Sequence, residues 1–406
     1  MRSDPAADVL VLEHGPREAP YAVSAALESA GLRPRRCRAW AGDPVPDTPA
    51  DLAALILTGA PETGARTGEQ ALLEAALAAE VPVLAVHRGA RLLAEAARAR
   101  GSAPPAPAAA GERPDRARYP DVDEVRMSLG ARTDPLLAGL PALVRVPHHR
   151  RHGALALPPG AALLASCDRH PVVAYRVGGS AWGLLFPLGA PGRADGVPAR
   201  FAALVAERAE RTATRTFFTP RADAWERRFA SDAPVYAAAV ARMGLRPGRR
   251  ALDVGCGTGR ALPALRAQVG AQGVVLGVDL TAAMLTTAAR EGRRAHAGLL
   301  LADAGRLPLP SGAVDGVFSA GLVDHVPDPA AALGEWARVT APGGVLLLFH
   351  PSGRAERAAR HGRSLDPGDL LAEANLWPAL RAAGWLPDHH EDAPHHFLAR
   401  AIRPGP

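Results

Sequence analysis

Lysine is absent from this sequence, aromatic residues make up only 4% of it, and cysteine occurs three times in 406 residues. Because Cys37, Cys167 and Cys256 show no paired spacing, a disulfide framework and a cysteine zinc site are both disfavoured. With so few aromatic residues, the cores must be built from alanine, leucine and valine.

Long apolar runs are missing as well. No stretch of about 18 uncharged apolar residues is present, and Met1–Pro5 begins no apolar signal region. We therefore expect a cytoplasmic chain that does not enter a membrane. The formal net charge is +6, yet the arginines are scattered among acidic residues instead of clustering with aromatics. Nucleic acid is accordingly not an expected partner.

The chain length fits two α/β domains. In the first half, strand-like apolar runs alternate with helix-like stretches, which predicts a parallel sheet covered by helices on both faces. We place one domain at residues 1–211, a linker at 212–219 and a second domain at 220–406.

The first domain is expected to contain several short strands and helices. The expected strands are 8–13, 35–38, 52–57, 81–86, 161–165, 172–176 and 181–186, the expected helices are 19–30, 69–79, 91–98 and 198–211, and the Ala/Pro-rich stretch 101–111 is expected to be a loop.

The run Ala251–Arg260 is the most informative part of the second domain. It reads as a strand leading into Gly255, Gly257 and Gly259, and the next apolar run ends on Asp279. Glycines let a ligand lie against backbone N–H groups at the start of a helix. The carboxylate is placed to bind two ribose hydroxyls. The pattern therefore predicts a nucleoside-binding crevice.

Two alternatives compete with this interpretation. A dinucleotide fingerprint has a small residue at its sixth position for close helix packing, but this chain has Arg260 there. A glycine turn without any ligand would not account for Asp279 and Asp303, which both stand at strand ends.

Together these residues resemble the cofactor site of class I S-adenosylmethionine-dependent methyltransferases. Gly277–Met284 and Leu301–Pro310 look like the second and third motifs of that family, Val314–Asp328 like the motif of the fourth strand, and Arg338–Gly344 like the turn before the fifth. The resemblance implies a Rossmann-like, seven-stranded domain. Residues 384–388 and 396–402 would form its closing antiparallel hairpin.

The resemblance also implies the roles of individual residues. Asp279 would bind the ribose, Met284 would pack near the adenine, and Asp303 would meet the adenine amino group. The full implied set for S-adenosyl-L-methionine is Asp253, Gly255, Cys256, Gly257, Gly259, Asp279, Leu280, Met284, Asp303 and Ala304.

Methyl transfer from an activated sulfonium depends chiefly on positioning, and a base is needed only if the acceptor must lose a proton. His325 and His350 follow the fourth and fifth strands and are the candidate bases, although histidines at such positions more often serve packing. The expected acceptor pocket consists of Phe218, Trp225, His325, His350 and Arg354. No metal site is expected, because the pairs His389-His390 and His395-His396 each point to opposite faces of their strands.

The first domain resembles a class I glutamine amidotransferase-like domain, which implies a flavodoxin-like fold. The matching segments are 58–61, 82–94, 134–141, 157–161 and 181–186. The nucleophilic cysteine of that family lies at a strand-to-helix elbow, and His87 stands there in this chain. Its histidine and glutamate are also missing, because Phe186 is followed by Pro187, Leu188 and Gly189. We therefore predict that this domain does not hydrolyse glutamine.

The sequence thus predicts two doubly wound domains and a methyltransferase acting on a small-molecule acceptor. A protein that binds S-adenosylmethionine without turnover, and a hydrolase acting through the first domain, remain as alternatives. The role of the first domain stays open among docking a protein partner, binding a small molecule and supporting folding. Arg88 and Arg91 beside His87 would attract an anion, or would be a solvated basic rim.

Overall fold

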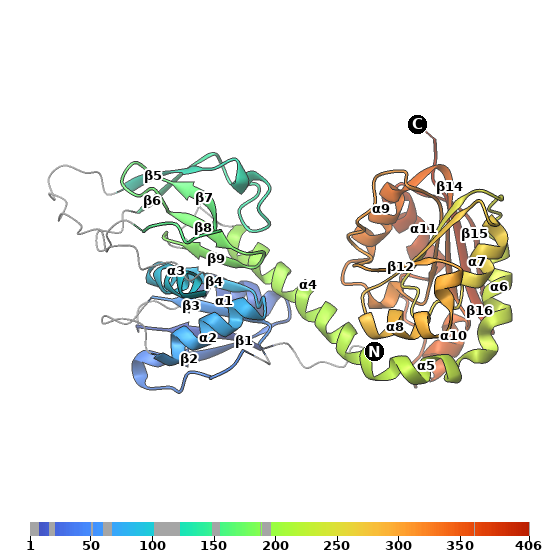
Figure 1. The fold of residues 1–406 in the computed structure, drawn as a ribbon, viewed down its shortest axis with the longest axis horizontal. Helices are drawn as coiled ribbons and strands as arrows, with labels where there is room; N and C mark the ends of the chain where they lie inside the picture. The colour runs from blue at the N-terminus through green and yellow to red at the C-terminus, as the bar shows by residue number, and fades with distance from the viewer. Residues whose placement is uncertain are drawn as a thin grey trace, which may run out of the picture. The chain divides into compact units, whose positions relative to one another are not determined.

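The computed structural model describes residues 8–15, 21–49, 52–59, 67–100, 122–147, 155–186, 188, 196–360 and 362–405 (Figure 1). The chain divides into an N-terminal unit, Met1–Ala209, and a C-terminal unit, Glu210–Pro406. The expected loop at 101–111, the end of the turn at 60–61, and residues 187 and 189 lie outside the described residues.

The N-terminal unit alternates strands and helices in its first half and is built from strands in its second. Its elements are β1 (Asp8–Glu13), α1 (Tyr21–Ser29), β2 (Arg33–Arg38), η1 (Ala39–Ala41), β3 (Ala54–Thr58), α2 (Thr67–Ala78), β4 (Val83–Val86), α3 (Arg88–Arg100), β5 (Val122–Met127), η2 (Gly130–Arg132), β6 (Leu143–Pro147), β7 (Ala162–Ser166), β8 (Ala174–Val177), β9 (Ala181–Leu184) and the first part of α4 (Gly196–Phe218).

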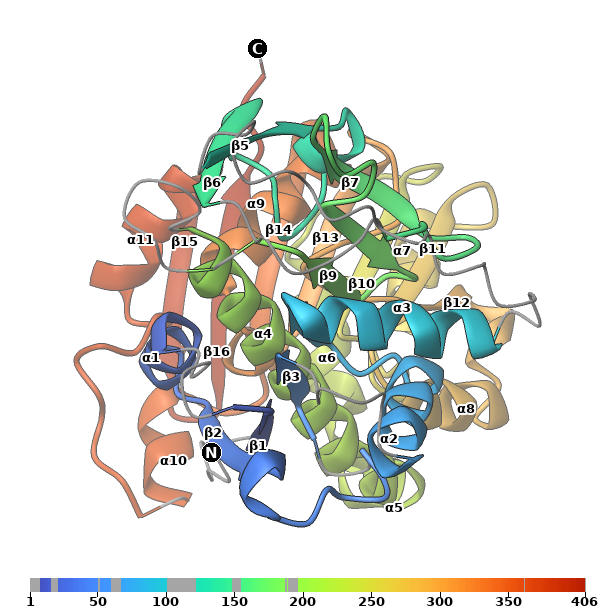
Figure 2. The same ribbon diagram turned by 90° about the vertical axis from the view of Figure 1, so that its left-hand side faces the viewer.

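These nine strands form one mixed sheet in the order β2-β1-β3-β4-β9-β8-β7-β5-β6. The pairs from β2 to β9 are parallel and the remaining pairs are antiparallel. Residues of α1 and α4 are buried against one face and residues of α2 and α3 against the other. Figure 2 shows α2 and α3 on the opposite side of β1 and β3 from α1. The strands β3 and β4 are buried throughout, and β1 is buried except at Asp8, because apolar side chains point toward both covered faces.

The C-terminal unit continues from α4 through three short helices into a second sheet. Its further elements are η3 (Thr219–Arg221), α5 (Ala222–Arg228), η4 (Ala230–Asp232), α6 (Ala233–Ala241), β10 (Arg250–Val254), α7 (Leu262–Val269), β11 (Val274–Asp279), α8 (Ala282–Arg290), η5 (Arg293–Ala295), β12 (Gly298–Leu301), β13 (Val314–Ala320), η6 (Val323–His325), α9 (Pro329–Val339), β14 (Thr340–His350), α10 (Arg354–Arg360), α11 (Glu373–Ala382), β15 (Leu386–Ala393) and β16 (His396–Ile402).

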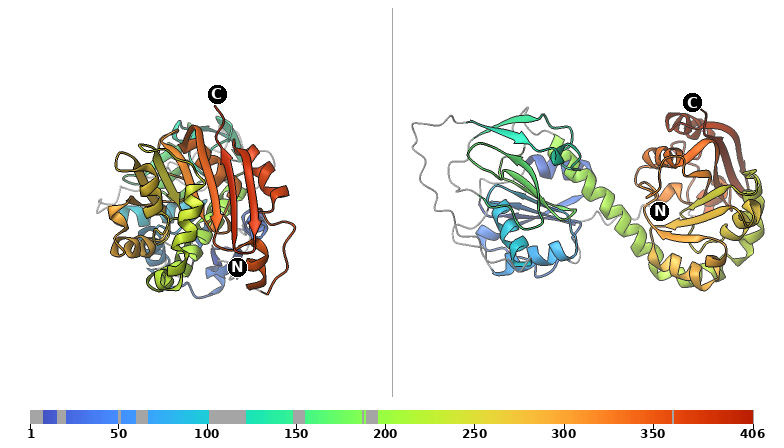
Figure 3. Two further views of the ribbon diagram at one scale, coloured as in Figure 1. Left: turned by 90° about the vertical axis from the view of Figure 1, so that its right-hand side faces the viewer. Right: turned by 45° about the horizontal axis from the view of Figure 1, so that its top comes forward.

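The second sheet has seven strands in the order β12-β11-β10-β13-β14-β16-β15. The left view of Figure 3 shows its last strands, coloured orange and red, side by side. Only β16 runs antiparallel to its neighbours, which confirms the closing hairpin predicted from the sequence. Residues of α9 and α11 pack on one face of this sheet, and residues of α6 and α7 on the other. The carboxyl ends of the parallel strands therefore meet along one edge, where ligands bind in open α/β sheets.

The structure differs from the sequence prediction in two places. Helix α4 continues to Phe218 and covers most of 212–219, which the sequence suggested to be a linker. Nothing in that stretch stops a helix before Pro220, since it has no glycine and its threonines lower helix propensity only slightly. The strands β5 and β6 were not predicted at all.

In the described ranges no helix combines the length and the apolar character needed to cross a bilayer.

Candidate functional site

The turn after β10 contains the three glycines of the motif, and all three have positive φ: 71° at Gly255, 55° at Gly257 and 78° at Gly259. Side chains are disfavoured in this region of backbone space. A Cβ at Gly255 would lie 2.9 Å from Leu322, whereas one at Gly257 would meet no atom within 4 Å. Gly257 therefore leaves open space beside the backbone, as a bound ligand requires.

Asp279, at the end of β11, holds this turn together. Its Oδ2 accepts a hydrogen bond from Gly257 N at 2.9 Å, and its Oδ1 accepts one from Thr281 N at 2.8 Å. Burial raises the pKa of Asp279, and these backbone hydrogen bonds oppose that effect. Hydrogen bonds from the Thr281 side chain and the Leu280 backbone also stabilise this carboxylate.

Asp253, in β10, is only 2% exposed. Burial, and then the charge of nearby Asp279, raise the pKa of Asp253 to about 8, while Arg260 acts in the opposite direction. Two buried carboxyl groups thus lie beneath the turn with one nearby arginine. A cationic ligand at this place would stabilise the charged form of Asp253.

Asp303, two residues beyond β12, stands at the same edge of the sheet. Its Oδ1 accepts a hydrogen bond from Gly305 N at 2.8 Å, and its Oδ2 forms an ion pair with Arg211 of α4 at 2.5 Å. Nearby, Arg215 Nε donates to the carbonyl of Leu280 at 3.3 Å. Asp303 and Leu280, two members of the implied cofactor set, are therefore both in contact with α4.

The remaining implied residues are buried around the edge. Cys256 and Ala304 are each 8% exposed and Met284 is 2% exposed. Burial raises the pKa of the Cys256 thiol well above its usual value, so this group is neutral and unreactive at pH 7. The carbonyl of Ala304 accepts a hydrogen bond from Trp336 Nε1 at 2.9 Å, which fixes the loop after β12.

The segment from Arg211 to Asp232, here named the cap, packs onto this edge. Three of the residues expected to form the acceptor pocket meet in it: the ring of Phe218 lies 5.5 Å from Trp225 and 5.2 Å from His325. Such edge-to-face contacts between aromatic rings are favourable.

Polar contacts anchor the cap to the glycine turn and to α8. Glu226 accepts a hydrogen bond from Thr258 at 2.8 Å and pairs with Arg293 at 2.8 Å. Asp223 pairs with Arg290 of α8. A third ion pair joins Arg260 to Asp232, at the end of the cap, with a distance of 3.2 Å. These contacts could not be predicted from the sequence, because the partners lie roughly thirty to seventy residues apart.

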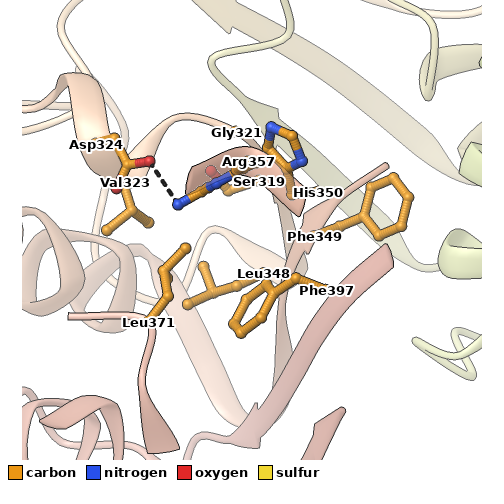
Figure 4. Close-up of a pocket in the computed structure, with 10 residues that line it drawn as sticks. All are labelled: Ser319, Gly321, Val323, Asp324, Leu348, Phe349, His350, Arg357, Leu371 and Phe397. Atoms are coloured by element: carbon orange, nitrogen blue, oxygen red, sulfur yellow. Dashed lines mark ion pairs between the residues drawn. The ribbon is translucent and has the colours of Figure 1, made fainter. Parts of the chain in front are cut away.

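A small pocket lies beyond the ends of β13 and β14 (Figure 4). It is lined by Ser319, Gly321, Val323, Asp324, Leu348, Phe349, His350, Arg357, Leu371 and Phe397. Arg357 and Asp324 form an ion pair across it at 3.0 Å. The buried hydroxyl of Ser319 has no hydrogen-bond partner there. Since Leu322, between Gly321 and Val323, packs over Gly255, this pocket adjoins the glycine turn.

Of the two candidate bases, His350 is partly buried and His325 is more exposed. Burial lowers the pKa of His325, and it lowers the pKa of His350 to about 4. His350 Nδ1 lies 3.1 Å from both the carbonyl oxygen and the amide nitrogen of Ser352. Both imidazoles are thus neutral at pH 7 and able to accept a hydrogen bond, but His350 is a weak base.

Other predicted residues have structural partners instead. Arg354 pairs with Asp369 at 2.7 Å and with Asp392 at 3.5 Å, and Arg357 takes the place in the pocket that the sequence suggested for Arg354. In the hairpin, His389 and His396 both contact Glu391, and His390 contacts the carbonyl of Leu371. Within the described part of the chain, no three His, Cys, Asp or Glu residues are grouped as metal ligands would be.

The N-terminal unit has a comparable edge at the carboxyl ends of β1, β3 and β4. His87 follows β4 directly and has a φ of 57°, a conformation that costs a non-glycine residue energy. A Cβ on the neighbouring Gly89 would come within 2.8 Å of the Leu57 carbonyl oxygen. At the end of β1, the buried His14 contacts Glu69 at 3.1 Å and the Thr58 carbonyl at 3.0 Å.

Comparison with known proteins identifies part of the C-terminal unit. Residues 252–348 match the family model of a methyltransferase domain. The chain is 40% identical over 107 residues to an uncharacterized 37.1 kDa protein in transposon TN4556 of Streptomyces fradiae, covering 26% of this chain and 31% of that protein.

The chain is also 31% identical over 173 residues to the ubiquinone/menaquinone biosynthesis C-methyltransferase UbiE of Bordetella parapertussis, covering 41% of this chain and 61% of that enzyme. A solved S-adenosylmethionine-dependent methyltransferase from Aquifex aeolicus is 25% identical, with 41% of this chain and 89% of the other covered and a TM-score of 0.36. The match thus spans between about a third and three fifths of the length of these two curated relatives.

The family match begins within β10 and ends within β14, so it includes the glycine turn and both strand-end carboxylates. The C-terminal region of the chain therefore contains a class I S-adenosylmethionine-dependent methyltransferase domain.

Proposed function

We propose that this chain transfers a methyl group from S-adenosyl-L-methionine to a small-molecule acceptor. The observation that carries the proposal is the joint placement of Gly257, Asp279 and Asp303 at one edge of the seven-stranded sheet. Open space at Gly257 and the carboxylate of Asp279 beside it fit a nucleoside lying along that edge.

S-adenosylmethionine, when bound, supplies a methyl group already activated by the sulfonium. The protein's task is then to position and shield the reactants. Asp279 would hold the ribose hydroxyls and Asp303 the adenine amino group. Asp253 lies below the turn and would lose its proton to face the cationic amino acid portion, because a nearby positive charge lowers the pKa of a carboxyl group.

The acceptor would bind in the pocket of Figure 4, next to the glycine turn. Its polar groups are the Ser319 hydroxyl, the His350 imidazole and the ion pair of Arg357 with Asp324, and its remaining lining is largely apolar. This lining suits an uncharged acceptor with an apolar body and one hydrogen-bonding group. His350 would then orient the acceptor by accepting a hydrogen bond, and His325 would lie under the aromatic side chains of the cap.

Calorimetric titration with S-adenosylmethionine and its demethylated product, followed by a screen with labelled methyl groups, tests this proposal. Binding of both and transfer to a small molecule would support it. Tight binding without transfer to any acceptor would instead favour a protein that only senses the cofactor. Because two relatives are named a ubiquinone/menaquinone biosynthesis C-methyltransferase and a demethylmenaquinone methyltransferase, demethylmenaquinone is a rational first compound for the screen.

For the N-terminal unit, we propose an amidotransferase-like domain without glutamine hydrolysis. The strained conformation of His87 after β4 supports this, because it has the geometry of a nucleophile elbow with an imidazole where a thiol is required. Purified protein should release no ammonia from glutamine. Release that is lost on substitution His87→Ala would contradict the proposal.

A further inference from the structure

Helix α4 reaches the adenine end of the proposed crevice with two arginines. Arg211 pairs with Asp303 at 2.5 Å, and Arg215 donates to the Leu280 carbonyl at 3.3 Å. Arg211 and Arg215 are one helical turn apart, so they lie on the same side of α4. Leu280 directly follows Asp279, which puts both contacts within the stretch that would enclose a base and its ribose.

The contact of Arg211 falls on the atom that an adenine would use. Asp303 Oδ1 already accepts a hydrogen bond from Gly305 N, so Oδ2 is the oxygen left to accept one from an amino group. The guanidinium of Arg211 faces that oxygen. A neutral amino group is a weaker partner for a carboxylate than a guanidinium is. A base and Arg211 therefore compete for the same carboxylate.

We propose that Arg211 and Arg215 set the affinity of the domain for adenosine-containing ligands, by holding α4 against the adenine end until the ligand displaces Arg211 from Asp303. The inference rests on the proposed function, because that function assigns the adenine to Asp303. The inference gives α4 a role in the selection and release of the cofactor, and the glycine turn alone does not provide that role.

The other polar contacts of the cap allow a ligand to displace Arg211 from Asp303. Glu226 holds Thr258 and Arg293, and Asp223 holds Arg290, and none of these contacts involves Asp303. Arg211 can thus leave its partner while the rest of the cap stays attached to the turn and to α8. The expected change is a local movement at the end of α4.

The size of the effect follows from the exposure of the pair. The side chains of Arg211 and Asp303 are 28% and 21% exposed, so solvent weakens their attraction. Partly exposed ion pairs of this kind correspond to a roughly two- to fivefold change in affinity. Added salt should reduce the difference, since it screens exposed charges.

The test measures binding by calorimetry to the full chain, with S-adenosylhomocysteine, adenosine and methionine as separate probes. The variants are Arg211→Gln, which removes the charge, and Arg211→Lys, which keeps it. Thr212→Ala is the matched control, because Thr212 is an exposed neighbour on the same helix. Thermal unfolding of each variant checks that the fold is retained.

Arg211→Gln should bind S-adenosylhomocysteine and adenosine about two- to fivefold more tightly at low salt, with methionine binding unchanged. Arg211→Lys and Thr212→Ala should remain near the wild type, and Arg215→Gln should show a smaller gain. Unchanged or weaker binding by Arg211→Gln would overturn the inference. If Arg211→Gln gains affinity but no acceptor is methylated, the inference stands and the proposed function fails. If the wild-type protein binds none of the three probes, both the inference and the proposed function are refuted.

Discussion

The two units place different groups at the same position of their sheets. In the N-terminal unit, the residue that follows β4 is His87, which has a side chain although its φ is 57°. In the C-terminal unit, the turn after β10 uses three glycines and leaves open space at Gly257. The first arrangement is suited to an attacking side chain, and the second to a ligand held against the backbone. The chain thus combines a turn that places a side chain at positive φ with a turn that leaves its backbone open.

The comparison is tested most strongly by removing the carboxylate that holds the glycine turn. Asp279→Ala removes the hydrogen bonds to Gly257 N and Thr281 N and the proposed partner of the ribose. We expect about 100-fold weaker binding of S-adenosylhomocysteine, as measured by calorimetry, because charge-assisted hydrogen bonds are lost.

The control for this variant is Asp315→Ala. Asp315 accepts hydrogen bonds from the backbone and side chain of Arg250 at the beginning of β10, at the opposite edge of the sheet. It should affect stability and leave ligand binding unchanged. Equal loss of binding in both variants would show that Asp279 acts only through folding.

The second prediction concerns the pH dependence of cofactor binding. Since the pKa of Asp253 is raised to about 8 and a cationic ligand favours the ionised form, binding should release a proton. The affinity for S-adenosylmethionine should rise about tenfold between pH 7 and pH 9 and then level off. Asp253→Asn should abolish this rise, and a wild-type affinity that does not change with pH would contradict the assignment.

The same group predicts the pH dependence of stability without ligand. The folded state keeps the proton of Asp253 to higher pH than the unfolded chain does. Its contribution to the free energy of unfolding is therefore complete below about pH 4 and declines as the pH rises toward 8. Denaturant titrations of the wild type and of Asp253→Asn across that range give the contribution of this residue as their difference.

The smallest expected effects come from two substitutions at positive φ, one that adds a side chain to the glycine turn and one that removes the side chain after β4. Gly257→Ala places a Cβ at φ of 55° without a steric clash, so it should destabilise by about 1–2 kcal/mol. His87→Gly relieves a similar strain and should stabilise by up to about 1 kcal/mol, less the entropy that glycine gains in the unfolded chain. Thermal unfolding measures both. A destabilised His87→Gly would show that the imidazole makes contacts worth more than the strain.

Much of the fold could be predicted because its strands are apolar runs. The strands β1, β3, β4, β10, β11 and β14 each stand out as short runs of valine, leucine, isoleucine and alanine, and the glycine turn and Asp279 follow such runs directly. β5 and β6 were missed because neither is a continuous apolar run: adjacent Asp123 and Glu124 interrupt Val122–Met127, and the short Leu143–Pro147 contains Arg145 and ends in proline.

The site could be predicted only where it is local in sequence. Asp279 and Asp303 follow strands, so their positions at the edge were readable. The pair of Arg211 with Asp303 joins residues that no periodicity or motif connects, and it depends on the end of α4 at Phe218. Ser319 and Arg357 in the pocket were missed for the same reason, since α10 approaches β13 only in the folded chain.

Titration of the intact protein with S-adenosylhomocysteine and, separately, with a nicotinamide dinucleotide tests the central claim most directly. The placement of Gly257, Asp279 and Asp303 predicts saturable binding of one S-adenosylhomocysteine per chain and no binding of the dinucleotide. No detectable binding at millimolar S-adenosylhomocysteine, or binding of the dinucleotide in its place, would contradict the account.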